Sequence, residues 1–154
     1  MEDGEAELEK LGYELSRKAL ERQERTLDEL RSRTALLLAA SSVSASFLGA
    51  RAAESRFGVL TAALFAFVVS IGLAAYVVFP QPGLIFSIRG STLIDSEADD
   101  PAGIRETYRR LAYWLEGFLD DNQPLIDKRF AAYRLATIAL LGQVVLWVVE
   151  ILTQ

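Results

Sequence analysis

The chain of 154 residues contains no cysteine and no histidine. Their absence excludes disulfide bonds, thiolate zinc sites, cysteine nucleophiles and histidine general bases. The sequence also has no phosphate-binding loop and no G-x-S-x-G nucleophile motif. We therefore expect a protein that is not an enzyme, with no catalytic residues, no cofactor and no metal site.

Positive charge is scarce relative to negative charge. The chain has 16 Lys and Arg against 21 Asp and Glu, a formal net charge of −5 at pH 7. A nucleic-acid partner requires a basic surface that neutralises phosphates, so nucleic acid is not an expected partner. Hydrophobic residues make up 51% of the chain and charged residues 24%. This mixture predicts apolar spans separated by charged segments.

The clearest apolar span covers residues 57–79, which include no charge and no proline. A bilayer core about 30 Å thick requires about 20 predominantly apolar residues in a helix. The core helix of a soluble protein would carry a polar stripe at every third or fourth position, and this segment has none. Residues 57–79 are therefore predicted to form a transmembrane helix.

Two further segments, residues 34–53 and residues 131–152, are apolar enough to be predicted as spans. Residues 34–53 are rich in small side chains, and Arg51, Glu54 and Arg56 predict a polar turn before the next span. The sequence thus predicts an all-α integral membrane protein with three transmembrane helices, forming a single membrane domain over the whole chain.

The charged segments are predicted to be helical extensions on the cytoplasmic side. Residues 5–33 are good helix formers with a leucine stripe, which either packs against another part of the chain or mediates self-association. Residues 80–130 are predicted to be a loop followed by an amphipathic helix at 101–120. The run Asp121-Asn122-Gln123-Pro124 predicts a break before the third span.

The orientation follows from the basic residues near the span ends. Six Lys and Arg residues lie between Arg17 and Arg33, before the first span, against two in the predicted turn, Arg51 and Arg56. This bias predicts a multi-pass membrane protein with a cytoplasmic N-terminus. Residues 80–130 are then cytoplasmic too, and the C-terminus lies outside.

Three polar residues within the predicted spans are the candidate functional residues: Ser42, Ser46 and Gln143. The serines are four apart, a spacing of small residues that lets helix backbones approach closely. They either pack against the second span or line a polar pore in an oligomer. Gln143 either hydrogen-bonds to a serine of the first span or to a backbone carbonyl, or it contributes to a conduction path. Glu150 is expected at the interface, because it lies near the chain end.

Two other polar motifs have plainer interpretations. The acidic run at 95–100 is expected to be a solvated turn rather than a calcium site, because it lacks the glycine and distal glutamate of an EF-hand loop. The tyrosines, tryptophan and arginines at 108–114 either grip an anionic ligand or belong to an ordinary amphipathic helix. The apolar spacing favours the ordinary helix.

The layout resembles the small bacterial membrane domains called SLATT and the related membrane-effector domain of Pycsar anti-phage systems. A charged helix runs directly into the first span through residues 30–38, a short turn leads to a second span, and residues 122–128 precede a further apolar helix. The resemblance implies a domain that oligomerises and permeabilises the inner membrane after a nucleotide signal. It implies no site residues.

Two functions are therefore expected. The first is a non-enzymatic inner-membrane effector or pore-forming subunit that forms homo-oligomers in the lipid bilayer. The alternative is a membrane-anchored scaffold that binds a protein partner through the apolar stripes of its cytoplasmic helices, at residues 8–30 and 104–118.

Overall fold

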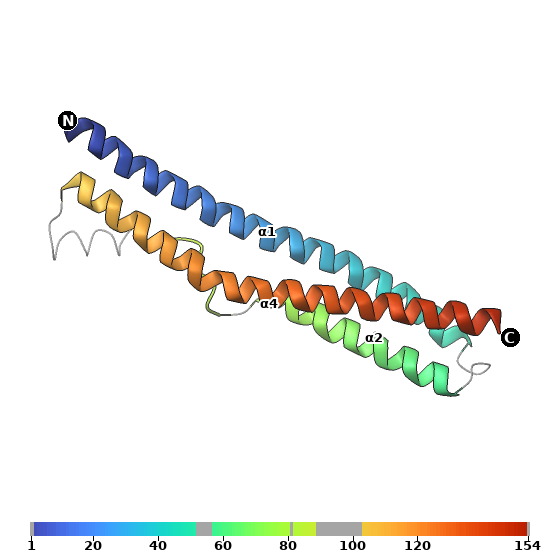
Figure 1. Cartoon of the computed structure of the whole chain (residues 1–154). Coiled ribbons are helices and arrows are strands. Elements are labelled where there is room, and N and C mark those ends of the chain that lie inside the picture. Colours follow the sequence, from blue (N-terminus) through green and yellow to red (C-terminus); the bar gives the residue numbers. More distant parts are fainter. Residues whose placement is uncertain (1, 52–56, 81, 89–102, 154) are drawn as a thin grey trace. The chain divides into compact units, whose positions relative to one another are not determined.

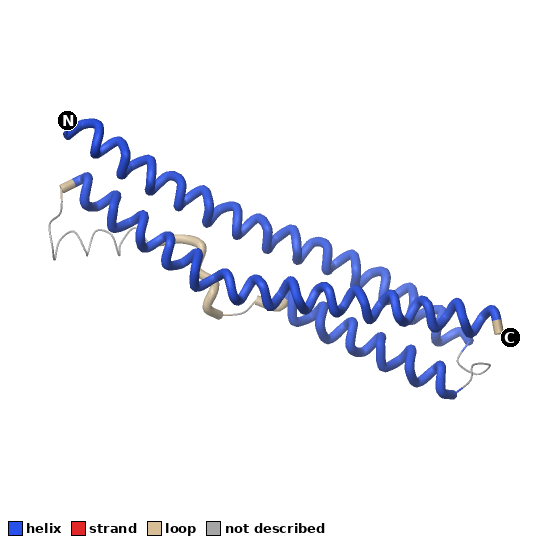
Figure 2. Tube along the Cα trace, in the orientation of Figure 1, coloured by secondary structure: helices blue, strands red, loops and turns tan. Residues whose placement is uncertain are grey.

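A computed structural model describes residues 2–51, 57–80, 82–88 and 103–153. Within these ranges the chain forms three helices and no strand, and 91% of the residues are helical. The helices are α1 (Glu2–Arg51), α2 (Phe57–Val78) and α4 (Ile104–Leu152), as Figure 1 shows. Figure 2 marks residues 82–88 as a loop between helices. The prediction of an all-α chain is confirmed.

Two of the described helices, α2 and α4, are long and apolar enough to cross a membrane. Helix α2 coincides with the predicted span at 57–79, and α4 contains the predicted span at 131–152. The span predicted at 34–53 falls largely within α1, and α1 is not one of the two helices that are long and apolar enough to cross a membrane. The predicted turn around Glu54 and the acidic run at 95–100 lie outside the described residues.

The break predicted at residues 121–124 is wrong, because α4 continues through Pro124. A proline removes one backbone donor, here the one that would bond the carbonyl of Asp120. Contacts to other segments hold the helix on the N-terminal side of Pro124: the Asn122 side chain is buried, and Gln23 Nε2 donates to the carbonyl of Leu119 at 3.2 Å. Tertiary contacts therefore outweigh the local signal for a helix end.

The described residues belong to two compact units. Unit 1 comprises residues 1–27 and 81–126, and unit 2 comprises residues 28–80 and 127–154. Helices α1 and α4 each contribute to both units, whereas α2 belongs to unit 2 alone. The two units differ in the chemistry of their interiors and surfaces.

Unit 1 is held by leucines and by polar contacts between α1 and α4. Its buried apolar side chains are Leu20, Leu27, Leu111, Leu115 and Ile126. The rings of Tyr13 and Tyr108 lie with centroids 5.6 Å apart, and the Ser16 hydroxyl donates to Glu116 Oε1 at 3.4 Å. The leucine stripe of residues 5–33 thus packs in part against the same chain, while Leu8, Leu11 and Leu15 stay exposed.

Unit 2 has a core of small side chains where three helices meet. Leu37, Ala74 and Ala136 are buried together, one each from α1, α2 and α4. The Ser70 hydroxyl donates to the carbonyl of Ala136 at 3.0 Å, which joins α2 to α4. Alanine and serine permit this close approach of helices.

Buried positions recur every seven residues along each helix. On α4 they are Leu115, Asn122, Arg129, Ala136, Gln143 and Glu150; on α1 they are Leu20, Leu27, Thr34 and Ser41; on α2 they are Ala63, Ser70 and Val77. A seven-residue repeat is typical of helices that pack along one seam in a left-handed coil. The repeat fixes which side chains face the interior of each unit.

Candidate functional site

The interior of unit 2 contains a set of buried polar side chains that we call the polar seam. Its members come from all three helices and are at most 2% exposed: Thr34, Ser41, Ser70, Arg129, Gln143 and Glu150. The outer faces of α2 and of the C-terminal part of α4 are apolar, and in the apolar window of each helix only 17% of the residues are buried. Soluble proteins have the opposite distribution, with charged and amide side chains outside.

The three hydroxyl groups of the polar seam are all hydrogen-bonded. Thr34 Oγ1 donates to the carbonyl of Leu30 at 2.7 Å, and Ser41 Oγ donates to the carbonyl of Leu37 at 2.9 Å. Such bonds to the preceding helical turn satisfy the donor without a partner on another helix. These hydroxyls are therefore inexpensive to bury.

Gln143 has no such partner. Its side chain is fully buried, and neither Oε1 nor Nε2 accepts or donates a hydrogen bond within the part of the chain that the structure describes. The predicted bond to a serine of the first span or to a carbonyl is wrong, because the Ser41 hydroxyl is directed to its own helix. One turn further along α4, Trp147 Nε1 also lacks a partner among the described residues. An unsatisfied buried amide costs about 1–3 kcal/mol.

Glu150 is 2% exposed, so its predicted position at an interface with water is wrong. It lies seven residues beyond Gln143 and shares its face of α4. The carboxyl group is not isolated, since Glu150 takes part in a further interaction. An ionisable residue inside a bundle with an apolar exterior is a typical mark of function.

The structure places Ser42 and Ser46 away from the polar seam. Both are exposed on α1, and each donates to a carbonyl of its own helix, Ser42 to Leu38 and Ser46 to Ser42, at 3.0 Å. The predicted packing of these two serines against the second span is therefore wrong. The neighbouring Ser41 is the buried one, because the seam follows a seven-residue repeat and not the four-residue spacing of the small side chains.

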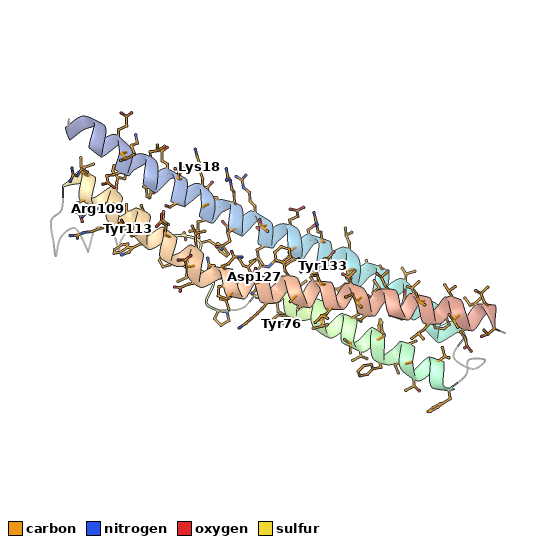
Figure 3. The ribbon with its side chains drawn as sticks, viewed as in Figure 1. Lys18, Tyr76, Arg109, Tyr113, Asp127 and Tyr133 are labelled. Atoms are coloured by element: carbon orange, nitrogen blue, oxygen red, sulfur yellow. The ribbon has the colours of Figure 1, made fainter. Side chains whose placement is uncertain are left out.

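Arg129 is the most unusual member of the polar seam. It is 1% exposed, and Nε, Nη1 and Nη2 all lack a hydrogen-bond partner among the described residues. Burial lowers the pKa of Arg129, the neighbouring charge of Arg31 lowers it further, and Tyr76 has the opposite effect. Figure 3 shows Tyr76 on α2, so three helices contribute to this cluster. The guanidinium stays protonated, since arginine does not deprotonate in proteins.

Arg31 supplies a second cation whose contacts are incomplete. Its Nη1 lies 3.1 Å from Asp28 Oδ1 on the same helix, while its buried Nε has no partner among the described residues. Arg129 is thus buried without a hydrogen-bond partner among the described residues, and the positive charge of Arg31 acts on it.

Two clefts in unit 1 are lined entirely by residues that the structure describes. The larger, about 520 Å³, is lined mainly by aromatic side chains and one carboxylate: Ser87, Ile88, Tyr113, Trp114, Gly117, Phe118 and Asp121. The smaller, about 370 Å³, lies between α1, residues 86–88 and α4. Both volumes are in the range of small-molecule sites.

The arginines at 108–114 do not turn toward an anion site. Arg109 Nη2 and Arg110 Nε lie 2.7 Å and 3.5 Å from the two oxygens of Glu106, and Tyr108 packs on Tyr13. These contacts agree with the ordinary amphipathic helix. Tyr113, which Figure 3 shows on the first part of α4, instead lines the larger cleft.

A sequence signal for the polar seam was present in the chain but was missed. Asn122, Arg129, Gln143 and Glu150 are separated by multiples of seven residues. A search for apolar positions alone overlooks this repeat. Arg129, Gln143 and Glu150 lie in or next to the predicted span at 131–152, where the apolar residues dominate the pattern. Polar side chains at one heptad position are expected to share a helix face.

Comparison of the chain with protein-family models, with curated proteins and with solved structures found no significant match. The polar seam and the clefts are therefore interpreted from their own geometry and chemistry.

Proposed function

We propose that this chain is a non-enzymatic protein of the bacterial inner membrane that oligomerises and permeabilises the bilayer. In this proposal residues 34–53, 57–79 and 131–152 lie in lipid, and residues 5–33 and 80–130 lie in the cytoplasm. The observation that carries the proposal is the inverted distribution in unit 2, with apolar side chains outside and the polar seam inside.

The apolar exterior of unit 2 is too large for an aqueous surface. Its exposed side chains include Leu64, Phe65, Val68, Leu135, Ile138, Leu141, Val145, Val148 and Val149. Burial of such a side chain is worth about 1.5–3 kcal/mol. The cost of exposing several such side chains to water together exceeds the usual unfolding free energy of a domain, about 5–15 kcal/mol. Contact with lipid accounts for the exposed apolar faces of both α2 and α4.

The C-terminal half of α1 is proposed as the third span. It contributes Leu37 to the core that α2 and α4 share, and its own outer face carries exposed Leu36 and Val43. A helix that packs against two membrane spans is most stable if it lies in the bilayer with them. The basic residues of α1 before residue 34 support a cytoplasmic N-terminus.

The polar seam supports a permeation role. The Gln143 amide and the Trp147 indole have unmet hydrogen-bonding capacity, and Glu150 adds an ionisable group to the same half of α4. The Gln143 amide and the Trp147 indole gain hydrogen bonds if water enters the bundle, so opening of the helices is favoured there. The exposed hydroxyls of Ser42 and Ser46 supply polar atoms on the outer face of α1, where a second copy is proposed to dock. The resemblance to SLATT and Pycsar effector domains points to the same function.

Dye release from liposomes tests this proposal. The purified full-length chain is expected to release a trapped fluorophore, with a rate that rises more steeply than linearly with the protein-to-lipid ratio. The Gln143→Leu variant is expected to reduce the rate several-fold, and Val145→Ala, an exposed apolar change on the same helix, is expected to leave it unchanged. Inserted protein that releases no dye at any ratio would contradict a permeation role.

A second function is favoured by one observation in unit 1. The apolar side chains Leu8, Leu11, Leu15 and Ile104 are exposed, so the two stripes do not fully cover each other. This surface supports the alternative of a membrane-anchored scaffold for a protein partner. Under that alternative the triple change Leu8→Ser, Leu11→Ser and Leu15→Ser abolishes partner capture from a cell, and the unaltered chain leaves liposomes intact.

A further inference from the structure

We propose that Arg129, Arg31 and Tyr76 form a binding site for a phosphate group, and that its ligand is the headgroup of an anionic phospholipid. The inference rests on the proposed function, in which the apolar spans of unit 2 lie in lipid. It adds a ligand class that a permeation role by itself does not require.

The unpartnered guanidinium of Arg129 is the first observation. Its three nitrogens are buried and have no hydrogen-bond partner in the described part of the chain. A buried charge without a counter-charge is strongly destabilising, and proteins pair such charges or bind an ion. An anion at this position would satisfy both the charge and the donors.

A second cation points to an anion with more than one oxygen. The Arg31 Nε is also buried and unpartnered among the described residues, and Arg31 is close enough for its charge to act on Arg129. Asp28 engages Nη1 of Arg31 only. Two nearby like charges are stabilised when an anion with more than one acceptor oxygen lies between them.

Phosphate has the geometry that this donor set requires. The planar fork of an arginine donates two parallel hydrogen bonds to phosphate or carboxylate oxygens. Tyr76, which interacts with Arg129 electrostatically, adds a hydroxyl from α2. The donors therefore come from three helices, and each of the three side chains is able to contribute to binding of one anion.

The surroundings favour a lipid over a soluble anion. Arg129 directly precedes the apolar part of α4, and exposed apolar side chains lie near the cluster on each helix: Leu36, Phe79 and Leu135. Acyl chains are able to cover these side chains while the headgroup meets the arginines. The long arginine side chain reaches a headgroup by a change of rotamer. Anionic lipids are concentrated in the cytoplasmic leaflet, where the site is proposed to lie.

The test uses the full-length protein in a zwitterionic detergent, with thermal unfolding followed by tryptophan fluorescence. The probes are phosphatidylglycerol, phosphatidylcholine with the same acyl chains, and inorganic phosphate. We expect phosphatidylglycerol at saturation to raise Tm by about 5 °C. Phosphatidylcholine is expected to have no such effect. Arg129→Gln is expected to lose most of the shift, whereas Arg134→Gln, the same change at an exposed position of α4, keeps it.

The arms of the experiment separate the two sources of phosphate. A shift with phosphatidylglycerol alone supports a lipid site, and an equal shift with inorganic phosphate at the same concentration supports a site for a soluble phosphate compound. The phosphate site is overturned if neither probe shifts Tm, or if Arg129→Gln keeps the full shift. If Arg129→Gln does not fold, Arg31→Gln replaces it, and native mass spectrometry counts the lipids that each protein retains. Loss of retained phosphatidylglycerol in Arg31→Gln supports the site, and unchanged retention overturns it.

Membrane fractionation keeps this result apart from the proposed function. Protein that is found in membranes but does not discriminate phosphatidylglycerol contradicts the phosphate site alone. Protein that stays in the aqueous fraction contradicts the membrane location, whatever inorganic phosphate does to its Tm.

Discussion

Units 1 and 2 use the same packing repeat with opposite chemistry. In unit 1 the seam positions of α1 and α4 are mostly leucines, and the outer side chains include ion pairs such as Arg17 with Glu21. In unit 2 the seam carries hydroxyls, an amide, a guanidinium and a carboxyl, and the outer faces of α2 and of the C-terminal part of α4 are apolar. A seven-residue repeat therefore specifies which face of a helix is buried, while the surrounding medium determines which side chains that face can carry.

The two units also differ in how they treat a buried amide. In unit 1, Asn122 Nδ2 donates to the carbonyl of Ile85 at 2.8 Å and to Gln23 Oε1 at 3.2 Å, and Asn122 Oδ1 accepts from the Ile85 N–H at 3.0 Å. In unit 2, Gln143 makes none of these bonds within the described structure. The hydrogen-bonded Asn122 therefore stabilises the packing of unit 1. The Gln143 amide adds no such hydrogen bond within the described part of unit 2.

The largest effect is expected for Leu111→Asp in unit 1. Leu111 is buried between α1 and α4, so the substitution places a charge at an apolar contact. The expected loss is about 3–5 kcal/mol of unfolding free energy. Thermal unfolding in detergent measures it, with Tyr113→Asp at an exposed position of the same helix as the control. Equal melting temperatures for the two variants would contradict the assignment of the buried face.

Asn122→Leu is expected to destabilise unit 1 by about 2–3 kcal/mol, since it removes the acceptor for the backbone N–H of Ile85 and the donor to Gln23 Oε1. Hydrogen exchange at the Ile85 amide reports the loss directly, as faster exchange than in the unaltered protein. Asp120→Ala, an exposed change on the same helix, should leave that rate as it is. Unchanged exchange in Asn122→Leu would show that this bond does not hold the loop.

The same type of substitution in unit 2 is expected to act with the opposite sign. Gln143→Leu removes an amide that has no partner in the described structure and should raise the unfolding free energy by about 1–2 kcal/mol. The melting temperature in detergent measures this gain, and Leu141→Ala on the exposed face serves as the control. A lower melting temperature for Gln143→Leu would mean that the amide is satisfied after all, and the contrast between the units would disappear.

The smallest effect is expected for Gly117→Ala. A methyl group at this position of α4 meets no atom within 4 Å, so it adds helix propensity without a clash. The expected gain is about 0.5–1 kcal/mol. Urea unfolding of the detergent-solubilised chain detects it. A loss of stability would indicate that the cleft beside Gly117 closes over this position.

Helix α2 was the part most readily predicted from the sequence. An uncharged run of more than 20 residues has few structural solutions, so α2 at Phe57–Val78 matches the predicted span within one residue. The continuity of α4 was not predictable from local signals. Pro124 normally ends a helix, and only the contacts from Gln23 and the burial of Asn122 show why it does not do so here.

The candidate site was predicted less well than the fold. Gln143 was identified correctly as a buried polar residue, but its missing partner depends on the direction of the Ser41 hydroxyl, which no sequence pattern specifies. Ser42 and Ser46 were chosen by a four-residue spacing, one position away from the buried Ser41. Arg129 was treated as one basic residue among several, because burial of a charge at a helix junction depends on three helices at once. The orientation and the inner-membrane location stay predictions.

Contact between lipid and the outer face of unit 2 is the central claim, and spin-label accessibility tests it most directly. The chain has no cysteine, so single cysteines at Val68 in unit 2 and Leu15 in unit 1 carry labels without other changes. In proteoliposomes the label at Val68 is expected to be accessible to oxygen and protected from a water-soluble nickel reagent, with the reverse at Leu15. A label at Val68 that the nickel reagent reaches as readily as the label at Leu15 would contradict the claim.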